Sequence, residues 1–283
     1  MILRLATWNV LAPEFYERLK PERFCERYPP APLDASARLD RVCARVRELA
    51  ARNDVVCLQE VECELVERLE PLRREGFTLH YEQRPEGKPD GVAALVRDAL
   101  PIEARARHEV VISYRGTGSD GTPERSDRAR RVTLHLRLAT PMACVNLLVA
   151  HAEWDDGCNK LDGETPLGTA QAARLMGILA ASPADVDIIA GDLNSSERCP
   201  CVRELLTQSF VAATRAGTTQ REPTSIDWDH ATGGFRTSSI DWILVRGARA
   251  ELVGEVRVPP NAPCEELPSD HLPVEAVVRV GTD

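Results

Sequence analysis

Residues 188–195 read IIAGDLNS, an apolar run that ends abruptly in Gly, Asp and Asn. If the apolar residues form a buried strand, Asp192 and Asn194 stand at its tip with their side chains on the same face. A carboxylate and an amide in that position suit a hard cation, a phosphate ester or a water that must be oriented. An Asx turn that ends an ordinary strand explains the same two residues, so the other strand ends must decide between these interpretations.

Six more polar residues follow or begin apolar runs elsewhere in the chain. They are Asn9, Glu60, His151, Asp241, Asp270 and His271. Each has an ordinary explanation by itself, such as a turn residue, a surface acid or a histidine packed in the core. Together they supply carboxylates for a divalent cation, donors for a phosphoryl group and an acceptor that can orient a water. Turns alone do not account for this combination, and we predict that the eight residues form one site.

The elements that would position these residues are short strands and amphipathic helices. Apolar residues at spacings of three and four predict helices over residues 36–53, 64–75, 167–181 and 198–208. In the second of these, Pro71 can kink or split the helix, and Gly76 is a natural C-terminal stop. Some strands follow one another directly, which favours mixed sheets over a strict βαβ repeat. We expect loops at residues 20–33, 114–128 and 152–166.

Composition and charge limit the classes of protein to which the chain can belong. Of its 283 residues, 43% are hydrophobic, yet no run approaches the ~20 apolar residues that span a bilayer. The first residues lack the features of a signal peptide, and nine cysteines are an odd number, so we expect a cytoplasmic protein. The net charge of −9 argues against nonspecific coating of nucleic acid. A nuclease is still allowed, because a carboxylate-rich metal site itself contributes negative charge.

Two local features stay open from the residues alone. Cys199 and Cys201 form a close pair, but no second Cys or His pair at finger spacing completes a zinc site. The four arginines in residues 125–131 can contact phosphate, or they can form a solvated loop edge.

The chain resembles the endonuclease/exonuclease/phosphatase family, which has the DNase I-like fold, in a series of ordered motifs. These are TWN at residues 7–9, LQE at 58–60, the strand-final His151, GDLN at 191–194, IDWI at 240–243 and SDH at 269–271. The resemblance spans residues 5–274. It implies an α/β fold, a four-layer αββα sandwich of two mixed β-sheets flanked by helices. We expect residues 1–283 to form a single catalytic domain.

The resemblance implies roles for the residues around a metal ion and a water. Glu60 resembles the principal ligand of Mg²⁺, for which Mn²⁺ can substitute, with Asn9 and Asp270 close to the metal or its waters. Asp192 would orient the attacking water or act as its base. Asn194 would fix that water or a phosphate oxygen.

Three further residues would act on the phosphate. His271 resembles the histidine that donates to the phosphate, and Asp241 would hold its imidazole in the right tautomer. His151 matches the position of a further phosphate contact. The implied reaction is in-line attack of water on a phosphodiester, assisted by Mg²⁺.

Finer features are similar to the deadenylase, nocturnin and 2′-phosphodiesterase group of this family. The resemblance rests on TWNVLA at residues 7–12, CLQEVE at 57–62 and KPDGVA at 88–93. Two departures are Val92, where the group usually has cysteine, and Trp242, where it usually has tyrosine.

The same group implies a set of substrate contacts. Phe235 resembles an aromatic residue that stacks on a base, although it can equally pack under a loop. Lys88 and Arg84 either meet RNA phosphate or are solvated. The acidic residues between His151 and Pro166 should repel long polyanions and so favour short oligonucleotides.

We therefore expect a 3′–5′ exoribonuclease of deadenylase type that acts on RNA or short oligonucleotides, with no membrane contact and no obligate protein partner. An abasic-site or exonuclease III-like DNA repair nuclease is one alternative, and a small-molecule phosphodiesterase is another. A non-catalytic binding module is a third hypothesis. The signature of such a module would be a missing metal carboxylate or histidine, and neither is missing here.

Overall fold

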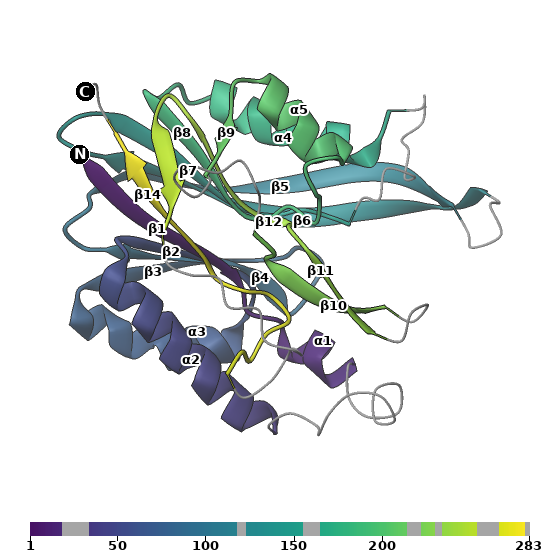
Figure 1. The fold of residues 1–283 in the computed structure, drawn as a ribbon, viewed down its shortest axis with the longest axis horizontal. Helices are drawn as coiled ribbons and strands as arrows, with labels where there is room; N and C mark the ends of the chain where they lie inside the picture. The colour runs from purple at the N-terminus through teal and green to yellow at the C-terminus, as the bar shows by residue number, and fades with distance from the viewer. Residues whose placement is uncertain are drawn as a thin grey trace.

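Two six-stranded β-sheets pack face to face, and helices cover their outer faces (Figure 1). The computed structural model describes residues 1–18, 34–117, 123–154, 165–213, 222–229, 234–253 and 266–280. The layers run helix, sheet, sheet, helix, so the α/β sandwich predicted from the sequence is confirmed.

The first sheet has the strand order β13-β14-β1-β2-β4-β3. Its strands are β1 (Ile2–Asn9), β2 (Val55–Glu62), β3 (Phe77–Gln83), β4 (Asp90–Arg97), β13 (Arg249–Leu252) and β14 (Val274–Arg279). Strand β1 runs parallel to β2 and antiparallel to β14. The sheet is therefore mixed, as the direct succession of strands predicted.

The second sheet has the order β5-β6-β7-β8-β12-β9. Its strands are β5 (Ile102–Thr117), β6 (Pro123–Ala139), β7 (Cys144–His151), β8 (Val186–Asp192), β9 (Val211–Ala212) and β12 (Asp241–Arg246). Strands β7 and β8 are parallel, and β12 runs antiparallel to β8. A separate hairpin consists of β10 (Ser225–Asp229) and β11 (Gly234–Ser238).

The four predicted helices are present with small shifts at their ends. They are α2 (Ala35–Arg52), α3 (Cys63–Leu69) with the 3₁₀ helix η1 (Glu70–Glu75), α4 (Leu167–Ala180) and α5 (Pro200–Thr207), and a short α1 (Pro13–Arg18) precedes them. Pro71 lies in the first turn of η1 and splits the second predicted helix, and Gly76 ends it at a φ of 84°. No helix in the described ranges is long and apolar enough to cross a membrane.

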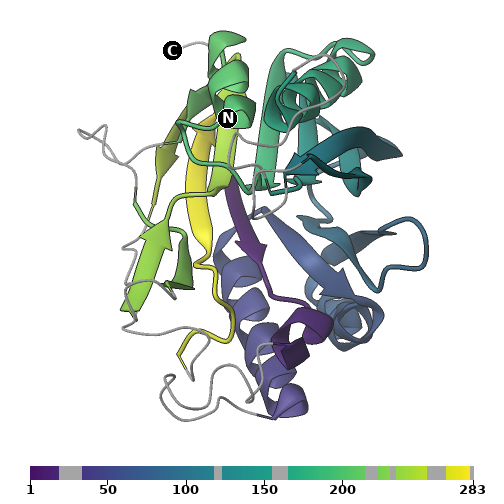
Figure 2. The ribbon, with the colours of Figure 1, turned by 90° about the vertical axis from the view of Figure 1, so that its right-hand side faces the viewer.

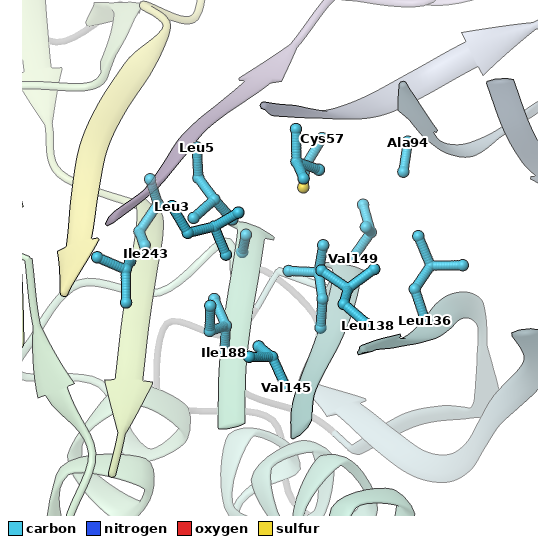
Figure 3. Close-up of a cluster of buried hydrophobic side chains, with 14 of the residues drawn as sticks. Leu3, Leu5, Cys57, Ala94, Leu136, Leu138, Val145, Val149, Ile188 and Ile243 are labelled. Carbon is cyan, nitrogen blue, oxygen red and sulfur yellow. The ribbon is translucent and has the colours of Figure 1, made fainter. Parts of the chain in front are cut away.

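The main hydrophobic core lies between the two sheets (Figure 3). Leu3 and Leu5 of β1 face Ile188 of β8 and Ile243 of β12 across this layer. Trp8, on the other face of β1, belongs to a second core beneath α2 and α3. Because alternate residues of a strand point to opposite faces, one apolar strand serves both layers. The sheets are thereby held in fixed relation to each other.

The prediction of a loop over residues 114–128 is wrong for most of that stretch. Strand β5 continues to Thr117, and β6 begins at Pro123. The two strands pair antiparallel along their whole length, with Ser113 opposite Arg128. The ladder of backbone hydrogen bonds holds these polar residues in strands. A prediction based on apolar periodicity does not detect such a ladder.

The end of α2 is joined to β14 by an ion pair whose effect on stability depends on pH. Arg52 donates to both carboxylate oxygens of Glu275, each at 2.6 Å, and Asn53 Nδ2 donates to one of them at 2.7 Å. Burial raises the pKa of Glu275, but the hydrogen bonds from Arg52 and Asn53 outweigh burial and hold the pKa below its ordinary value. The contact therefore stabilises the fold above the unfolded-state pKa of about 4.3, and this contribution is lost as the pH falls through the lowered value.

We expect Glu275→Gln to lower the free energy of unfolding by about 1 kcal/mol near neutral pH, because the partly exposed ion pair is lost. The difference from the wild type should shrink at acid pH, where the wild-type carboxyl is itself protonated. Urea unfolding of both proteins over a pH series measures this. A difference that stays constant down to the acid end of the series would contradict the assignment.

Candidate active site

The ends of parallel strands bring the polar residues of both sheets to one end of the sandwich, the end that faces the viewer in Figure 2. Asn9, the last residue of β1, pairs with Gln59, the neighbour of Glu60. In the other sheet His151, the last residue of β7, pairs with Asp192. The antiparallel β12 places its first residue, Asp241, opposite Asp192. The signal of polar residues at strand tips thus reflects real proximity in space.

Glu60 is turned into the site by a β-bulge. The pairing of β2 with β4 shifts between Gln59 and Val61, and Glu60 between them has a φ of 59°. A bulge re-aims a side chain, and a left-handed conformation in a residue other than glycine costs about 1–3 kcal/mol. The carboxylate is held from two sides, because Oε1 accepts from Asn9 Nδ2 and Oε2 from the backbone N of Ala12, both at 2.9 Å.

The side chain of Asp192 contacts residues from both sheets. Its Oδ2 accepts from Asn9 Nδ2 at 3.0 Å and lies 3.6 Å from Nε2 of His151 and 3.8 Å from Nε2 of His271. Its Oδ1 accepts from the backbone N of Asn194 at 2.7 Å. With 1% of its surface exposed, this carboxylate is fixed in position by neighbours from four segments of the chain.

The backbone on both sides of Asp192 has unusual geometry. A Cβ on Gly191, which has a φ of 150°, would lie 1.8 Å from the carbonyl oxygen of Ala150 in β7. Only glycine allows this close approach of β8 to β7. Asn194 has a φ of 47°, and its Nδ2 donates to the carbonyl of Ala152 at 3.0 Å and lies 3.2 Å from Nε2 of His151.

His271 is paired with a buried acid. Its Nδ1 lies 2.9 Å and 3.1 Å from the two carboxylate oxygens of Asp241, which has no exposed surface. Burial lowers the pKa of His271, but Asp241 and Asp192 raise it well above its ordinary value. The imidazole therefore carries a positive charge, with Nδ1–H directed at Asp241 and Nε2–H available to a ligand.

His151 has the opposite character. Burial and the nearby guanidinium groups of Arg131 and Arg84 lower its pKa well below the ordinary value. Nη1 of Arg131 lies 3.5 Å from Nδ1 of the imidazole. The site therefore holds a neutral histidine beside the charged His271, and such a separation of pKa values is typical of catalytic groups with different roles.

Both carboxylates at the centre bind protons more readily than ordinary acids. Burial, with the charge of Asp241, raises the pKa of Asp192 to about 6. Burial, with the charge of Asp270, raises the pKa of Glu60 to about 7. A buried acid of this kind is either a proton acceptor near neutral pH or a ligand whose charge a cation balances.

The donor atoms fit a hard divalent cation. Among the described residues, Asp192, Asp241 and His271 each offer a ligand atom within 4.8 Å of the others. Asp241, however, directs both of its oxygens at the imidazole. Glu60, whose pKa is raised by burial and by the charge of Asp270, would offer together with Asp270 the carboxylate oxygens that Mg²⁺ prefers. A cation bound by these two acids would offset both the burial of Glu60 and the repulsion from Asp270, which together raise the pKa of Glu60.

A cavity of about 370 Å³ opens beside these residues. Asn194, Asp270 and His271 line it, together with residues that include Trp154, Cys199 and Arg236. Small-molecule sites span about 300–1,000 Å³, so the cavity has room for a group of nucleotide size.

The structure brings all eight residues from the strand ends to this site. The three residues predicted to bind substrate differ in their surroundings. Arg84 does not extend into solvent, since its Nη1 lies 3.2 Å from both carboxylate oxygens of the buried Asp90. Lys88 is exposed in the turn between β3 and β4. Phe235 lies in β11, and its side chain is outside the part that the structure describes.

One arginine beside the site was not singled out by the sequence. Arg131 holds Glu153 through a pair of hydrogen bonds at 3.0 Å and 3.2 Å and contacts His151 with its third nitrogen. The signal in the sequence is the run of arginines at residues 125–131, for which the residues alone allow either phosphate contact or a solvated edge. The position of Arg131 in β6, next to the end of β7, distinguishes it from the others in that run.

Comparisons with known proteins agree with this geometry. The sequence matches the model of the Endonuclease/Exonuclease/phosphatase family over residues 6–271. No curated protein matches the chain in sequence.

Solved structures are similar in fold at low sequence identity. ANGEL2, a 2′,3′-cyclic phosphatase in complex with adenosine-2′,3′-vanadate, has a TM-score of 0.68 and 16% identity, and the match covers 100% of this chain and 96% of that chain. The human Nocturnin catalytic domain with bound sulfate has a TM-score of 0.62 and 17% identity over 99% and 93% of the two chains. Truncated Caenorhabditis elegans TDP2 has a TM-score of 0.60 and 19% identity over 98% and 97%.

Proposed function

The chain belongs to the endonuclease/exonuclease/phosphatase family, and we propose that it is a Mg²⁺-dependent 3′–5′ exoribonuclease of deadenylase type that acts on RNA or short oligonucleotides. Family membership makes it a hydrolase of phosphate esters. The observation that carries the proposal is the convergence of Asn9, His151 and His271 on one buried oxygen of Asp192. We further propose that residues 1–283 form one catalytic domain that needs no obligate protein partner.

In the proposed reaction Asp192 accepts the proton of the attacking water. Its pKa of about 6 keeps it ionised near neutral pH and close enough to that pH for efficient proton transfer. Asn194 follows in the same turn and fixes the water or a phosphate oxygen. The hydrogen bond from its backbone N to Asp192 holds the two groups in fixed relation.

The two histidines stabilise the negative charge that develops on the phosphate. His271, charged and held by Asp241, donates through Nε2–H to a phosphate oxygen, and this interaction strengthens as negative charge accumulates there. His151 is a second, neutral contact, so the site adds only one positive charge on this side. The opposed pKa shifts of the two imidazoles support this division.

The metal belongs on the side of the first sheet. Glu60 and Asp270 would hold Mg²⁺, or Mn²⁺ in its place, and the ion when bound supplies Lewis-acid stabilisation of the phosphoryl oxygens. Asn9 directs its NH₂ group at Glu60 and Asp192, while its Oδ1 accepts from Leu11 N at 3.0 Å. We therefore propose that Asn9 acts beside the metal by spacing the two carboxylates.

Support for a nucleotide substrate comes from the cavity and from a structural neighbour. The cavity beside His271 has room for a nucleoside, and ANGEL2 was solved with an adenosine vanadate. Lys88 in its exposed turn, Phe235 in β11, and Arg84 stay candidates for contact with the rest of an RNA chain. The acidic residues after His151 favour short substrates over long ones.

A substrate panel tests the proposal. We expect Mg²⁺-dependent release of nucleotides from the 3′ end of 5′-labelled poly(A), with Mn²⁺ able to replace Mg²⁺ and EDTA abolishing activity. The panel also holds other RNAs, an adenosine 2′,3′-cyclic phosphate, abasic DNA and an aryl phosphodiester. Products separated by length distinguish stepwise trimming from internal cleavage.

Each pattern of activity has a definite meaning. Cleavage confined to abasic DNA would replace the RNA assignment by a DNA repair nuclease, and turnover of the aryl ester or cyclic phosphate alone would replace it by a small-molecule phosphodiesterase. Inactivity on every substrate with both metals would contradict the proposed chemistry.

A further inference from the structure

Arg38 is a buried arginine in α2 with no place in the chemistry described so far. Only 1% of its surface is exposed, which is rare for arginine. Its guanidinium stacks on the ring of Tyr16 in α1 at 4.5 Å. Burying a charge without compensating contacts is costly, so the partners of this group indicate what it holds in place.

The guanidinium of Arg38 donates hydrogen bonds to backbone carbonyls of two segments. Nη1 donates to Val10 at 3.0 Å and to Pro268 at 2.9 Å, and Nη2 donates to Leu11 at 2.6 Å. Val10 and Leu11 directly follow Asn9 at the end of β1, and Pro268 stands two residues before Asp270. One rigid side chain therefore joins the segment after β1 to the segment before β14.

The same two segments are joined by further hydrogen bonds around Arg38. Ser269 Oγ donates to the carbonyl of Asn9 at 2.7 Å and accepts from the backbone N of His271 at 3.1 Å. Trp8 Nε1 donates to the carbonyl of His271 at 2.8 Å. The backbone that carries Asn9 on one side and Asp270 with His271 on the other is thus one buried, cross-linked unit.

The charge of Arg38 also fits this location. Burial lowers the pKa of the guanidinium, while Tyr16, Asp270 and Glu60 offset part of this effect. An arginine stays protonated in proteins, so a permanent cation interacts with the two acids proposed to bind the metal.

We propose that Arg38 is a positioning residue for the metal site, which aligns Asn9 and Asp270 by clamping the backbone segments that carry them. This inference rests on the proposed metal site at Glu60 and Asp270. Residues that orient metal ligands typically change metal affinity by about 10–100-fold when they are replaced. Loss of the clamp should therefore weaken metal binding even though Arg38 itself touches no metal.

The test is the affinity of the folded protein for Mn²⁺, measured by titration calorimetry or by the EPR signal of free Mn²⁺. We expect Arg38→Met to weaken Mn²⁺ binding by about 10–100-fold. Arg38→Lys should weaken it less, because an ammonium keeps the charge and some of the donors but not the planar fork. If Arg38→Met does not fold, Arg38→Lys carries the test.

Arg52→Met is the matched control. Arg52 lies in the same helix and also joins it to the C-terminal part of the chain, through Glu275, but away from the site. It should lose stability and keep its Mn²⁺ affinity. The inference is overturned if a folded Arg38 variant binds Mn²⁺ as the wild type does, or if Arg52→Met weakens binding equally.

Because Mn²⁺ binding is read without turnover, failure of the RNA assignment leaves this inference standing. If the wild type degrades RNA but the Arg38 variants keep the Mn²⁺ affinity of the wild type, only this inference is overturned.

Discussion

Asp192→Asn is expected to lower kcat for phosphodiester hydrolysis by about 10²–10⁴-fold, the range that removal of a general base produces. An amide keeps the size of the side chain but cannot take a proton from water. Replacement also removes the acceptor on which Asn9, His151 and His271 converge. The measurement is kcat at saturating substrate and Mg²⁺, with thermal unfolding of the same samples to show that the fold persists.

Asp187→Asn provides the control for this prediction. Asp187 is the second residue of the same strand and is similarly buried, with 7% exposed, but it accepts from Arg246 at 2.6 Å and Asn146 at 2.9 Å, at the opposite end of the strand. We expect this variant to unfold more easily and to keep its kcat. Wild-type turnover in Asp192→Asn, or an equal loss in Asp187→Asn, would show that the proton acceptor lies elsewhere.

Asp241→Asn is expected to lower kcat on the order of 10³–10⁴-fold, although Asp241 touches no substrate. The carboxylate holds Nδ1–H of His271 and maintains the positive charge of the imidazole. An amide in its place presents a neutral acceptor or a donor, so the imidazole loses its proton and its orientation. The charge that should meet the phosphate is then missing.

A double-mutant cycle separates this mechanism from simple damage to the fold. If Asp241 acts through His271, the variant that combines Asp241→Asn with His271→Ala should be no slower than His271→Ala alone. Losses in kcat that multiply would mean that the two residues act independently, and the pairing in the structure would have no catalytic role.

The eight residues of the site could be predicted from the sequence because each of them ends or begins an apolar run. Strand tips such as Asp192 and His151 are marked locally by an abrupt change from apolar to polar residues. Parallel strands end at the same edge, so a one-dimensional pattern becomes a three-dimensional cluster. Only the family resemblance, however, divided roles between residues as similar as Glu60 and Asp192.

The residues that escaped prediction depend on contacts between distant parts of the chain. Arg38 lies on a helix face where periodicity marks only apolar neighbours, and its partners at residues 10, 11 and 268 are near in space alone. Arg84 is a solvated cation or a buried partner of Asp90 depending on the β3–β4 pairing. Strands β5 and β6 stabilise each other across residues that carry no strand signal individually.

The position of Asn9 between the two sheets links the candidate site to substitutions in the core. Its Nδ2 spans the boundary between the two sheets, bonding Glu60 in one and Asp192 in the other. Each sheet supplies residues of the candidate site, and the apolar layer between the sheets lies beneath them. Because the core is closely packed, we expect a substitution that changes the volume of this layer to change the distance between Glu60 and Asp192 as well.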